Sequence, residues 1–263
     1  MKTVKIQGGI GNQLFGLAFA HSLASLSVER VTLDVASYDS DPYGRRFELG
    51  GLAERLSLEL CRKPLLANRL TGALMRRLPV PGYQTDGRAT LEVLARRQGY
   101  FDGYWQNAAW MARPEEVREA VSQFIREQAG ESADPPADLV LHFRTYKEET
   151  RMDRRSVPDT AWVRRALGAV DMRLGRTASV TLVSDDPALA LTHLGDLDRP
   201  VLTRAEAGPW ADLATLMDAK ALILTNSSFS WWGGFCSEAS TIVYPARGRF
   251  HHYPAPHPRF TVL

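Results

Sequence analysis

The sequence predicts an α/β protein made of two Rossmann-like domains, and three observations support this. Short apolar runs alternate with helical patterns along most of the 263 residues, as in parallel sheets with crossover helices. A glycine-rich turn follows the first apolar run. A small, polar stretch at 129–136 that ends in two prolines interrupts the alternation, which then restarts. We therefore predict domains at 1–134 and 135–263, with the active site in the crevice between them.

The N-terminal domain is expected to open as a β-α-β unit. Short apolar runs predict its strands, and apolar residues that recur at helical spacing predict its helices. In chain order these segments are strand 4–7, turn 8–13, helix 14–26, strand 30–35, a helical and basic region at 50–78, an aromatic strand at 99–105 and helix 114–128.

The C-terminal domain repeats the alternation more regularly. The expected segments are strands 138–143, 179–184, 200–202, 221–225 and 241–244, and helices 158–174, 187–194, 210–219 and 228–238. Because helices separate the strands, we expect a parallel sheet whose carboxyl strand ends face the ligand crevice.

Composition excludes several classes of protein. With 32 Lys and Arg against 30 Asp and Glu, the chain lacks the charge pattern of a dedicated nucleic-acid-binding protein. Its two cysteines, Cys61 and Cys236, form no disulfide framework. No signal peptide or membrane-spanning run is recognisable, so we expect a cytoplasmic protein. The preference for Arg over Lys indicates a bacterial source with a GC-rich genome.

The first candidate site is the glycine-rich turn after the first strand. Gly9, Gly11 and Asn12 precede a helix, whose N-terminus favours an anion, and glycine permits close backbone approach. The pattern G-x-G-x-x-G of dinucleotide-binding folds is broken by Leu14, although Asp34 lies where a ribose-binding acid is expected. A nicotinamide-dependent oxidoreductase and a glycine turn without ligand both stay open here.

The second candidate site ends the first strand of the C-terminal domain. His142 and Arg144 alternate along this strand, so both side chains point to the same side. Arginine suits a pyrophosphate because it is always charged and can bind two oxygens. The alternative is an ion pair of Arg144 with a nearby carboxylate, for which Glu148 and Glu149 are available.

Two further strand-to-helix junctions carry polar residues. Of Asp185 and Asp186, one is expected to cap the following helix, and the other can accept hydrogen bonds from guanine or a ribose. Residues 226–229 (Asn-Ser-Ser-Phe) supply an N-cap, hydroxyls and backbone N–H groups where a phosphate would bind. Of the adjacent Trp231 and Trp232, we expect at least one to shape the crevice, with a capped helix and two core tryptophans as the alternative.

Weaker patterns are interpreted as structural, and no metal site is expected. The D-x-D pattern of Asp39 and Asp41 is better explained by a turn. Three histidines at 251, 252 and 257 lie among prolines without a cysteine or acid at ligand spacing. The basic region 62–77 is expected to be a solvated helix face, with contact to a membrane or glycolipid as the alternative.

Four segments together resemble the bacterial α-1,2-fucosyltransferases, which belong to the inverting GDP-fucose-dependent transferases. They occur in the family's order: residues 9–15 (GIGNQLF), 103–106 (GYWQ), 142–144 (HFR, the start of H-x-R-R-x-D) and 212–232 (D-L to N-S-S-F-S-W-W). The last segment is long and unusual in composition, which makes it specific. Residues 36–98 and 145–178 are essentially unmatched.

The resemblance implies a GT-B-like fold, with two Rossmann-like domains facing each other across a cleft and the GDP-sugar bound mainly by the second. It implies transfer of L-fucose from GDP-β-L-fucose to a glycan hydroxyl, galactose O2 in an α-1,2 linkage. The reaction is expected to be a single displacement without metal or cofactor. The implied partners are a GDP-sugar and a glycan or glycoconjugate acceptor, and not a nucleic acid.

The resemblance also assigns roles to individual residues. Arg144 would contact the β-phosphate, His142 would lie near the nucleoside, and Asp186, in preference to Asp185, would bind the guanine edge. The remaining donor-binding residues implied in this way are Asn226, Ser227, Ser228 and Phe229 at the pyrophosphate, and Gly9, Gly11 and Asn12 from the other domain.

One part of the chain departs from the family pattern. Thr145 replaces the second Arg of the motif, and the Asp that follows in the family is replaced around Glu148 and Glu149. With Asp153, these glutamates are the candidate general bases, because they follow the phosphate-binding strand. The departure leaves open a transferase for another GDP-deoxyhexose and a weakly active GDP-sugar-binding protein.

Overall fold

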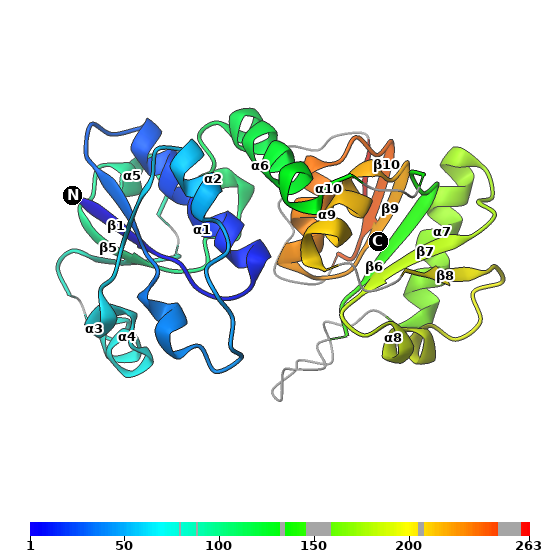
Figure 1. Cartoon of the computed structure of the whole chain (residues 1–263), viewed down its shortest axis with the longest axis horizontal. Coiled ribbons are helices and arrows are strands. Elements are labelled where there is room, and N and C mark those ends of the chain that lie inside the picture. Colours follow the sequence, from blue (N-terminus) through cyan, green and yellow to red (C-terminus); the bar gives the residue numbers. More distant parts are fainter. Residues whose placement is uncertain (79, 88, 132–134, 146–158, 205–207, 247–258) are drawn as a thin grey trace. The chain divides into compact units, whose positions relative to one another are not determined.

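The computed structural model describes residues 1–78, 80–87, 89–131, 135–145, 159–204, 208–246 and 259–263 (Figure 1). The chain divides into two compact units, Met1–Val121 and Ser122–Leu263. The division falls within helix α6 (Pro114–Ala129). The domain limits 1–134 and 135–263 stay a prediction. None of the described helices is long and apolar enough to cross a bilayer.

Unit 1 contains a parallel sheet with the strand order β3-β2-β1-β5-β4. Its strands are β1 (Lys2–Lys5), β2 (Val31–Asp34), β3 (Glu59–Cys61), β4 (Tyr83–Thr85) and β5 (Gly99–Asp102). Its helices are α1 (Ile10–Ser25), η1 (Ala36–Ser40), α2 (Gly50–Arg55), α3 (Pro64–Ala67), α4 (Arg69–Met75), α5 (Leu91–Ala95) and η2 (Ala108–Trp110). Along the chain, β2 and β3 are added on one side of β1, and β4 and β5 come afterwards on its other side. The direction of winding therefore reverses between β1 and β5.

Unit 2 contains a parallel sheet with the order β11-β10-β9-β6-β7-β8. Its strands are β6 (Leu139–Phe143), β7 (Val180–Ser184), β8 (Val201–Thr203), β9 (Ala221–Leu224), β10 (Thr241–Tyr244) and β11 (Phe260–Val262). Its helices are α7 (Thr160–Leu174), α8 (Pro187–Leu194), α9 (Pro209–Asp218) and α10 (Ser228–Cys236). The winding reverses between β6 and β9. The predicted α/β class with two parallel sheets is confirmed.

Apolar strands buried on both faces explain why the sequence pattern was clearest in unit 2. Every residue of β6 is buried, and Leu141 and Phe143 pack in one core with Val163 of α7 and Leu194 of α8. A parallel strand covered by helices on both sides carries a continuous apolar run rather than an alternation. The predicted strands of this unit accordingly lie within one or two residues of the observed ones.

The beginning of α1 differs from the prediction. The turn expected at 8–13 is shorter, because the N–H groups of Asn12 and Gln13 already donate to the carbonyl of Gly9, at 2.9 and 3.0 Å. Gly9 is the N-cap, and the helix begins at Ile10. The preceding Gly8 has φ of +81°, a conformation that favours glycine. The first turn of α1 therefore contains motif residues that were expected in a loop.

The continuous helical pattern expected at 50–78 is wrong. The structure instead has α2, then strand β3, then α3 and α4. Strands β4 and β11 were also not predicted. Each of these strands is three residues long and partly exposed, so none produces an apolar run. In both described sheets the edge strands, β8 included, have this length.

The expectation that one tryptophan of the Trp231-Trp232 pair would shape a crevice is also wrong. Trp231 is 3% exposed and Trp232 is not exposed, and their rings meet edge to face at 5.2 Å. Helix α10 is buried around most of its circumference, because Gly233 lets α9 come close. A Cβ atom at Gly233 would lie 2.6 Å from the Leu216 side chain.

Candidate functional site

The polar residues that the sequence singled out in unit 2 lie where three neighbouring strands end. Strand β6 pairs with both β7 and β9, and Arg144, Asp185 and Thr225 directly follow these strands. Figure 1 shows β6 between β7 and β9. Since the winding reverses between β6 and β9, this is the switch point of the sheet, where open α/β sheets bind ligands.

Arg144 is held at the switch point by contacts from two other strands. Its backbone N–H donates to Oγ1 of Thr225 at 3.1 Å, and its guanidinium Nη1 lies 3.1 Å from Oδ2 of Asp185. The other oxygen of that carboxylate accepts the N–H of Thr145 at 2.7 Å. The Arg144 side chain remains 25% exposed. Asp185 thus orients Arg144 while part of the guanidinium still faces solvent.

The two adjacent aspartates have different roles. Oδ1 of Asp186 accepts the N–H of Leu189 at 3.0 Å, so Asp186 is the N-cap of α8. Its own N–H donates to Ser184 Oγ at 3.2 Å. Asp185 is the one that contacts Arg144. The partner foreseen for Arg144 among Glu148 and Glu149 lies outside the described residues, as does Asp153.

His142 is a neutral, buried imidazole beside the first turn of α10. Burial, together with the charge of Arg144, lowers the pKa of His142 to about 3. Its ring lies 5.6 Å from the ring of Phe229, at 31° between the planes. Nδ1 of His142 has no hydrogen-bond partner among the described residues. The histidine therefore offers a polar atom and a ring face, but no positive charge at neutral pH.

The N-terminus of α10 also lies at this switch point. Oγ of Ser227 accepts the N–H of Phe229 at 3.2 Å and caps the helix. The hydroxyl of Ser230 donates to the carbonyls of Thr225 and Ser227, at 3.0 and 3.1 Å, which fixes the turn before the helix. Asn226 is buried in this turn, and Ser228 is partly buried. Helix N-termini attract anions through their dipole and N–H groups.

Thr145 stands where a second arginine was expected. Its side chain is 4% exposed, and Oγ1 has no hydrogen-bond partner within the described ranges. Thr145 therefore places a small, inward-facing hydroxyl between β6 and β7. A buried hydroxyl without a partner is unusual in a folded protein.

In unit 1, the residues of the glycine motif lie at the carboxyl end of β1. Gly9 and Gly11 flank the start of α1, and Oδ1 of Asn12 accepts Nε2 of Gln106 at 2.6 Å. Hydroxyl and amide groups of Tyr38 and Gln13 donate to the carbonyl of Gly8, at 3.0 and 3.3 Å. The turn is thus fixed by its own neighbours. Donor binding by Gly9, Gly11 and Asn12 stays a prediction.

The model of the family described as Glycosyl transferase family 11 matches residues 89–247, which is more than half of the chain. The chain belongs to this family. The resemblance to α-1,2-fucosyltransferases is confirmed, and the protein is a glycosyltransferase built from two α/β units, each with a parallel sheet. The matched region includes Arg144 and residues 226–229 but not the glycine motif of unit 1.

Solved fucosyltransferase structures are similar to this glycosyltransferase at low identity. The NodZ fucosyltransferase from Bradyrhizobium is 12% identical with a TM-score of 0.47, over 92% of this chain and 93% of that one. NodZ α-1,6-fucosyltransferase soaked with GDP-fucose gives 13% and 0.46, over 92% and 94%. The apo form of POFUT1 gives 12% and 0.40, over 89% and 94%. No curated protein matches the chain.

In this glycosyltransferase, the acid that would bind the ribose of a nicotinamide cofactor, Asp34, already binds other groups of the protein. Asp34 is fully buried. Its Oδ1 accepts the N–H groups of Ala36 and Lys63, at 3.1 and 2.9 Å, and Oδ2 accepts the hydroxyl of Tyr100 at 2.7 Å. A ribose would have to displace these partners. The geometry argues against the oxidoreductase alternative.

The aspartates of the D-x-D pattern are also engaged by neighbouring groups of the protein. Oδ1 of Asp41 accepts the N–H groups of Tyr43 and Arg45, at 2.9 and 3.1 Å, and Asp39 pairs with Arg62. The interpretation as a turn is confirmed. Within the described residues, no three His, Cys, Asp or Glu side chains are grouped as metal ligands.

Sequence reasoning missed two contacts at the strand ends. The hydroxyl of Thr225 anchors the backbone of Arg144, and Gln106 binds the motif residue Asn12. A signal existed for both. Thr225 is the polar residue that ends an apolar strand, and Gln106 closes the G-Y-W-Q segment.

Proposed function

We propose that this glycosyltransferase moves L-fucose from GDP-β-L-fucose to a glycan hydroxyl, forming an α-1,2 linkage to galactose O2 with inversion. The observation that supports the proposal best is the switch point of unit 2. There Arg144, oriented by Asp185, lies next to the strand that leads into the N-terminus of α10. A fixed guanidinium and a helix N-terminus are both suited to a diphosphate.

The leaving group explains why these two features belong together. As the bond from fucose to the β-phosphate breaks, negative charge grows on the phosphate oxygens. Arg144 and the N–H groups at the start of α10 stabilise that charge without having to reorganise, because Asp185, Thr225 and Ser230 already hold them in place. The site is half-buried, which strengthens the interaction relative to water.

The nucleoside is proposed to bind toward β7 and the ring of Phe229. Both oxygens of Asp185 already contact Arg144 and Thr145. The family resemblance prefers Asp186, and we keep it as the carboxylate that accepts the N–H pair of guanine. Its Oδ1 already caps α8, but each carboxylate oxygen can accept a second hydrogen bond. His142 and Phe229 offer apolar ring surface on the neighbouring strand and helix.

The acceptor side requires a base that takes the hydroxyl proton as the new C–O bond forms, and a substrate held in line. Glu148, Glu149 and Asp153 remain the proposed candidates for that base. They follow β6 in the chain, directly after Arg144 and Thr145. Substitution of each by its amide, with turnover and donor binding measured separately, identifies the base as the variant that binds GDP-fucose but does not turn over.

Thr145 supports a second candidate, a transferase for another GDP-deoxyhexose. The side chain is small and buried, where the family pattern has a cation. Removal of one positive charge changes what the pocket beside the sugar phosphate accepts. A pocket that differs by one charge discriminates among donors without any change in fold.

The experiment that separates these proposals is a donor screen. Purified protein with EDTA is given a panel of GDP-sugars, and GDP release is recorded with and without a galactose-terminated acceptor. Acceptor-dependent GDP release from GDP-fucose alone supports the first proposal and its independence of metal. Release from a different GDP-sugar supports the second. Binding of NAD without binding of GDP would contradict both.

A further inference from the structure

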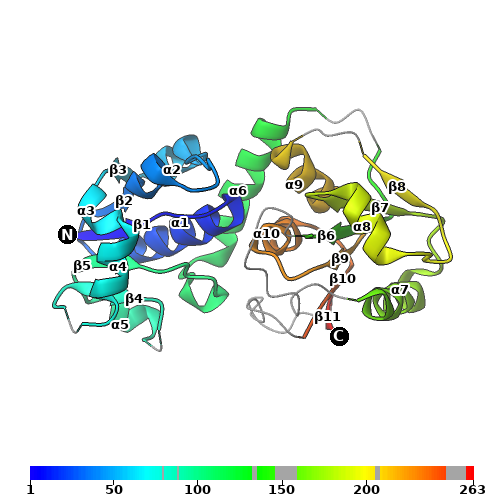
Figure 2. The ribbon, with the colours of Figure 1, turned by 90° about the horizontal axis from the view of Figure 1, so that it is seen from below.

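A segment of unit 1 outside the family match combines basic and apolar residues. Residues 60–85 contain five cations, at 62, 63, 69, 76 and 77, and no acidic residue. In the structure this stretch contains α3 and α4. The two helices lie beside each other in both views of the chain (Figures 1 and 2).

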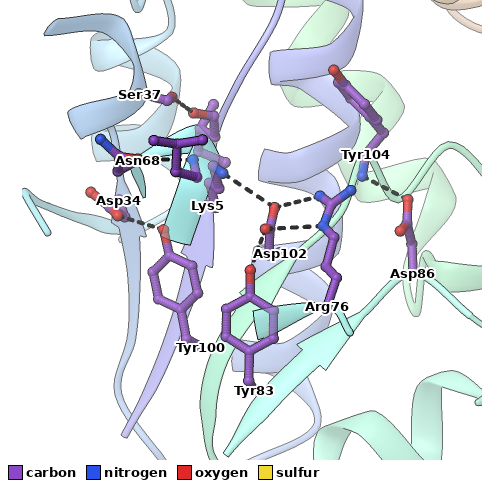
Figure 3. Close-up of polar contacts among 12 residues, drawn as sticks. Lys5, Asp34, Ser37, Asn68, Arg76, Tyr83, Asp86, Tyr100, Asp102 and Tyr104 are labelled. Atoms are coloured by element: carbon purple, nitrogen blue, oxygen red, sulfur yellow. Dashed lines mark hydrogen bonds and ion pairs between the residues drawn. The ribbon is translucent and has the colours of Figure 1, made fainter. Parts of the chain in front are cut away.

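One face of α4 is anchored to the sheet. Arg76 donates to both oxygens of Asp102 through Nε and Nη2, at 3.2 and 2.8 Å, and Asp102 is also contacted by Lys5 and Tyr83 (Figure 3). A Cβ atom at Gly72, one turn earlier, would lie only 3.3 Å from the same carboxylate. The face that carries Gly72 and Arg76 is therefore the inner face of α4.

The opposite face exposes leucines. Leu70 and Leu74, which share that face by helical spacing, are 82% and 58% exposed, while Leu65 of α3 is 81% and Leu78 is 52% exposed. We call these four residues the leucine face. None of the described residues covers them to any large extent. Soluble proteins rarely leave a group of large apolar side chains in water unless it contacts a partner.

The charges around the leucine face select the partner. Arg77 lies one turn after Ala73 and Leu74 on the outer face of α4 and is exposed, whereas the exposed Arg62 already pairs with Asp39. Helices that place leucine beside arginine, without acidic residues, bind at the boundary between lipid headgroups and acyl chains. A second copy of the same face would bring the two Arg77 side chains against one another, which opposes a symmetric dimer. Anionic phospholipid headgroups neutralise them.

We propose that the leucine face of α3 and α4 docks unit 1 on the surface of an anionic membrane. Leu65, Leu70, Leu74 and Leu78 enter the headgroup region, and Arg77 contacts lipid phosphates. The anchoring of Arg76 on Asp102 holds α4 in position for this contact. The inference does not depend on which sugar the enzyme transfers.

Vesicle sedimentation tests the leucines. The full chain is mixed with vesicles of phosphatidylcholine alone or with about one third phosphatidylglycerol, and we expect it to pellet with the second kind. The double variant Leu70→Ser, Leu74→Ser should bind at least about tenfold more weakly, because each leucine that leaves water contributes about that factor. Leu202→Ser, at a leucine of unit 2 that is 51% exposed, is the matched control and should bind normally.

The charge of the face is tested separately. Arg77→Gln should weaken binding to the anionic vesicles about fivefold, which is the usual effect of one cation near such a surface. Arg173→Gln, an equal loss of charge at an exposed position of α7, should have no effect. All four variants change exposed side chains, so their melting temperatures should equal that of the unsubstituted chain.

Three results overturn the proposal. The first is an unsubstituted chain that does not pellet with anionic vesicles. The second is a double leucine variant that pellets as well as Leu202→Ser. The third is a dimer in solution that the double variant dissociates while vesicle binding is absent. That result would assign the leucine face to a second copy of the chain.

Discussion

The two units have the same kind of switch point but use it differently. In unit 1 the switch lies between β1 and β5, and the residues that end these strands, Lys5 and Asp102, form an ion pair at 3.4 Å. Asp102 is fully buried and is also bound by Arg76 and Tyr83. Burial alone would raise the pKa of Asp102, but these partners outweigh it and hold the pKa below its ordinary value. The carboxylate is a structural anchor.

In unit 2 the switch lies between β6 and β9, and its charged pair is more open. The Arg144 and Asp185 side chains are 25% and 16% exposed, and polar atoms of His142 and Thr145 have no partner among the described residues. The topology thus supplies two equivalent positions for a ligand. The side chains decide that the first is filled from within, whereas the charged pair of the second stays partly exposed.

The largest expected effect comes from removing the buried carboxylate at the switch point of unit 1. Asp102→Ala leaves the buried Lys5 and the Arg76 guanidinium without their counter-ion, and we expect a loss of about 3–5 kcal/mol in the free energy of unfolding. Urea denaturation measures it. Asp86→Ala, at an exposed carboxylate that accepts one backbone N–H, is the control and should cost about 1 kcal/mol. Equal losses would show that the buried network is not special.

The next largest effect concerns the switch point of unit 2, where the charged pair is partly exposed. Arg144→Ala should lower turnover about 10²- to 10³-fold, because one preorganised group that stabilises developing charge is removed. Donor affinity should fall as well. The melting temperature should change little, since the side chain is partly exposed. Turnover close to that of the unsubstituted enzyme would show that the diphosphate binds elsewhere.

A smaller effect is expected when Arg144 stays but loses its orientation. Asp185→Asn keeps an acceptor for the Thr145 N–H while it removes the charge that holds the guanidinium. We expect turnover to fall about tenfold through positioning, with donor KM changed less. Asp185→Glu should restore part of the loss. A larger defect in Asp185→Asn than in Arg144→Ala would indicate that Asp185 contacts substrate directly.

The smallest effect is a pH dependence in unit 2. Burial raises the pKa of Asp212, at the start of α9, from 3.8 to about 6. The folded state therefore binds this proton more tightly than the unfolded state, so the contribution to stability is present below pH 3.8 and lost as pH rises through 6. Asp212→Asn removes the penalty and should be more stable than the parent by about 1 kcal/mol at pH 8, after solvent screening.

Melting temperatures of the parent and Asp212→Asn at pH 5 and pH 8 measure this difference. The gap between the two proteins should widen toward pH 8. A constant gap would mean that Asp212 titrates normally in the folded chain.

The sequence predicted those elements that a local pattern of apolar residues determines. The run Leu139–Phe143 identifies β6 because a doubly covered strand is apolar throughout, and alternation places Arg144 beyond its end. The positions of the polar site residues came partly from strand ends and partly from the family resemblance. Short strands such as β3 could not be predicted, because they are defined by pairing with β2 rather than by their own residues.

The partners within the site could be predicted only in part. Two neighbouring aspartates look equivalent in the sequence, yet Pro187 at the first position of α8 makes Asp186 the N-cap, and this signal was available. The contact of Asp185 with Arg144 joins residues from separate strands. Such a contact depends on strand order, which the spacing of residues does not reveal.

The three-residue edge strands affect how readily the chain aggregates while it folds. Parallel sheets form slowly, because their pairings join distant parts of the chain, and an exposed edge can meanwhile pair with another molecule. In the described sheets, β3, β4, β8 and β11 each present only three residues to such a partner. A short edge offers few backbone groups for pairing between chains. The short edge strands thereby protect the sheets against aggregation without a helix over each edge.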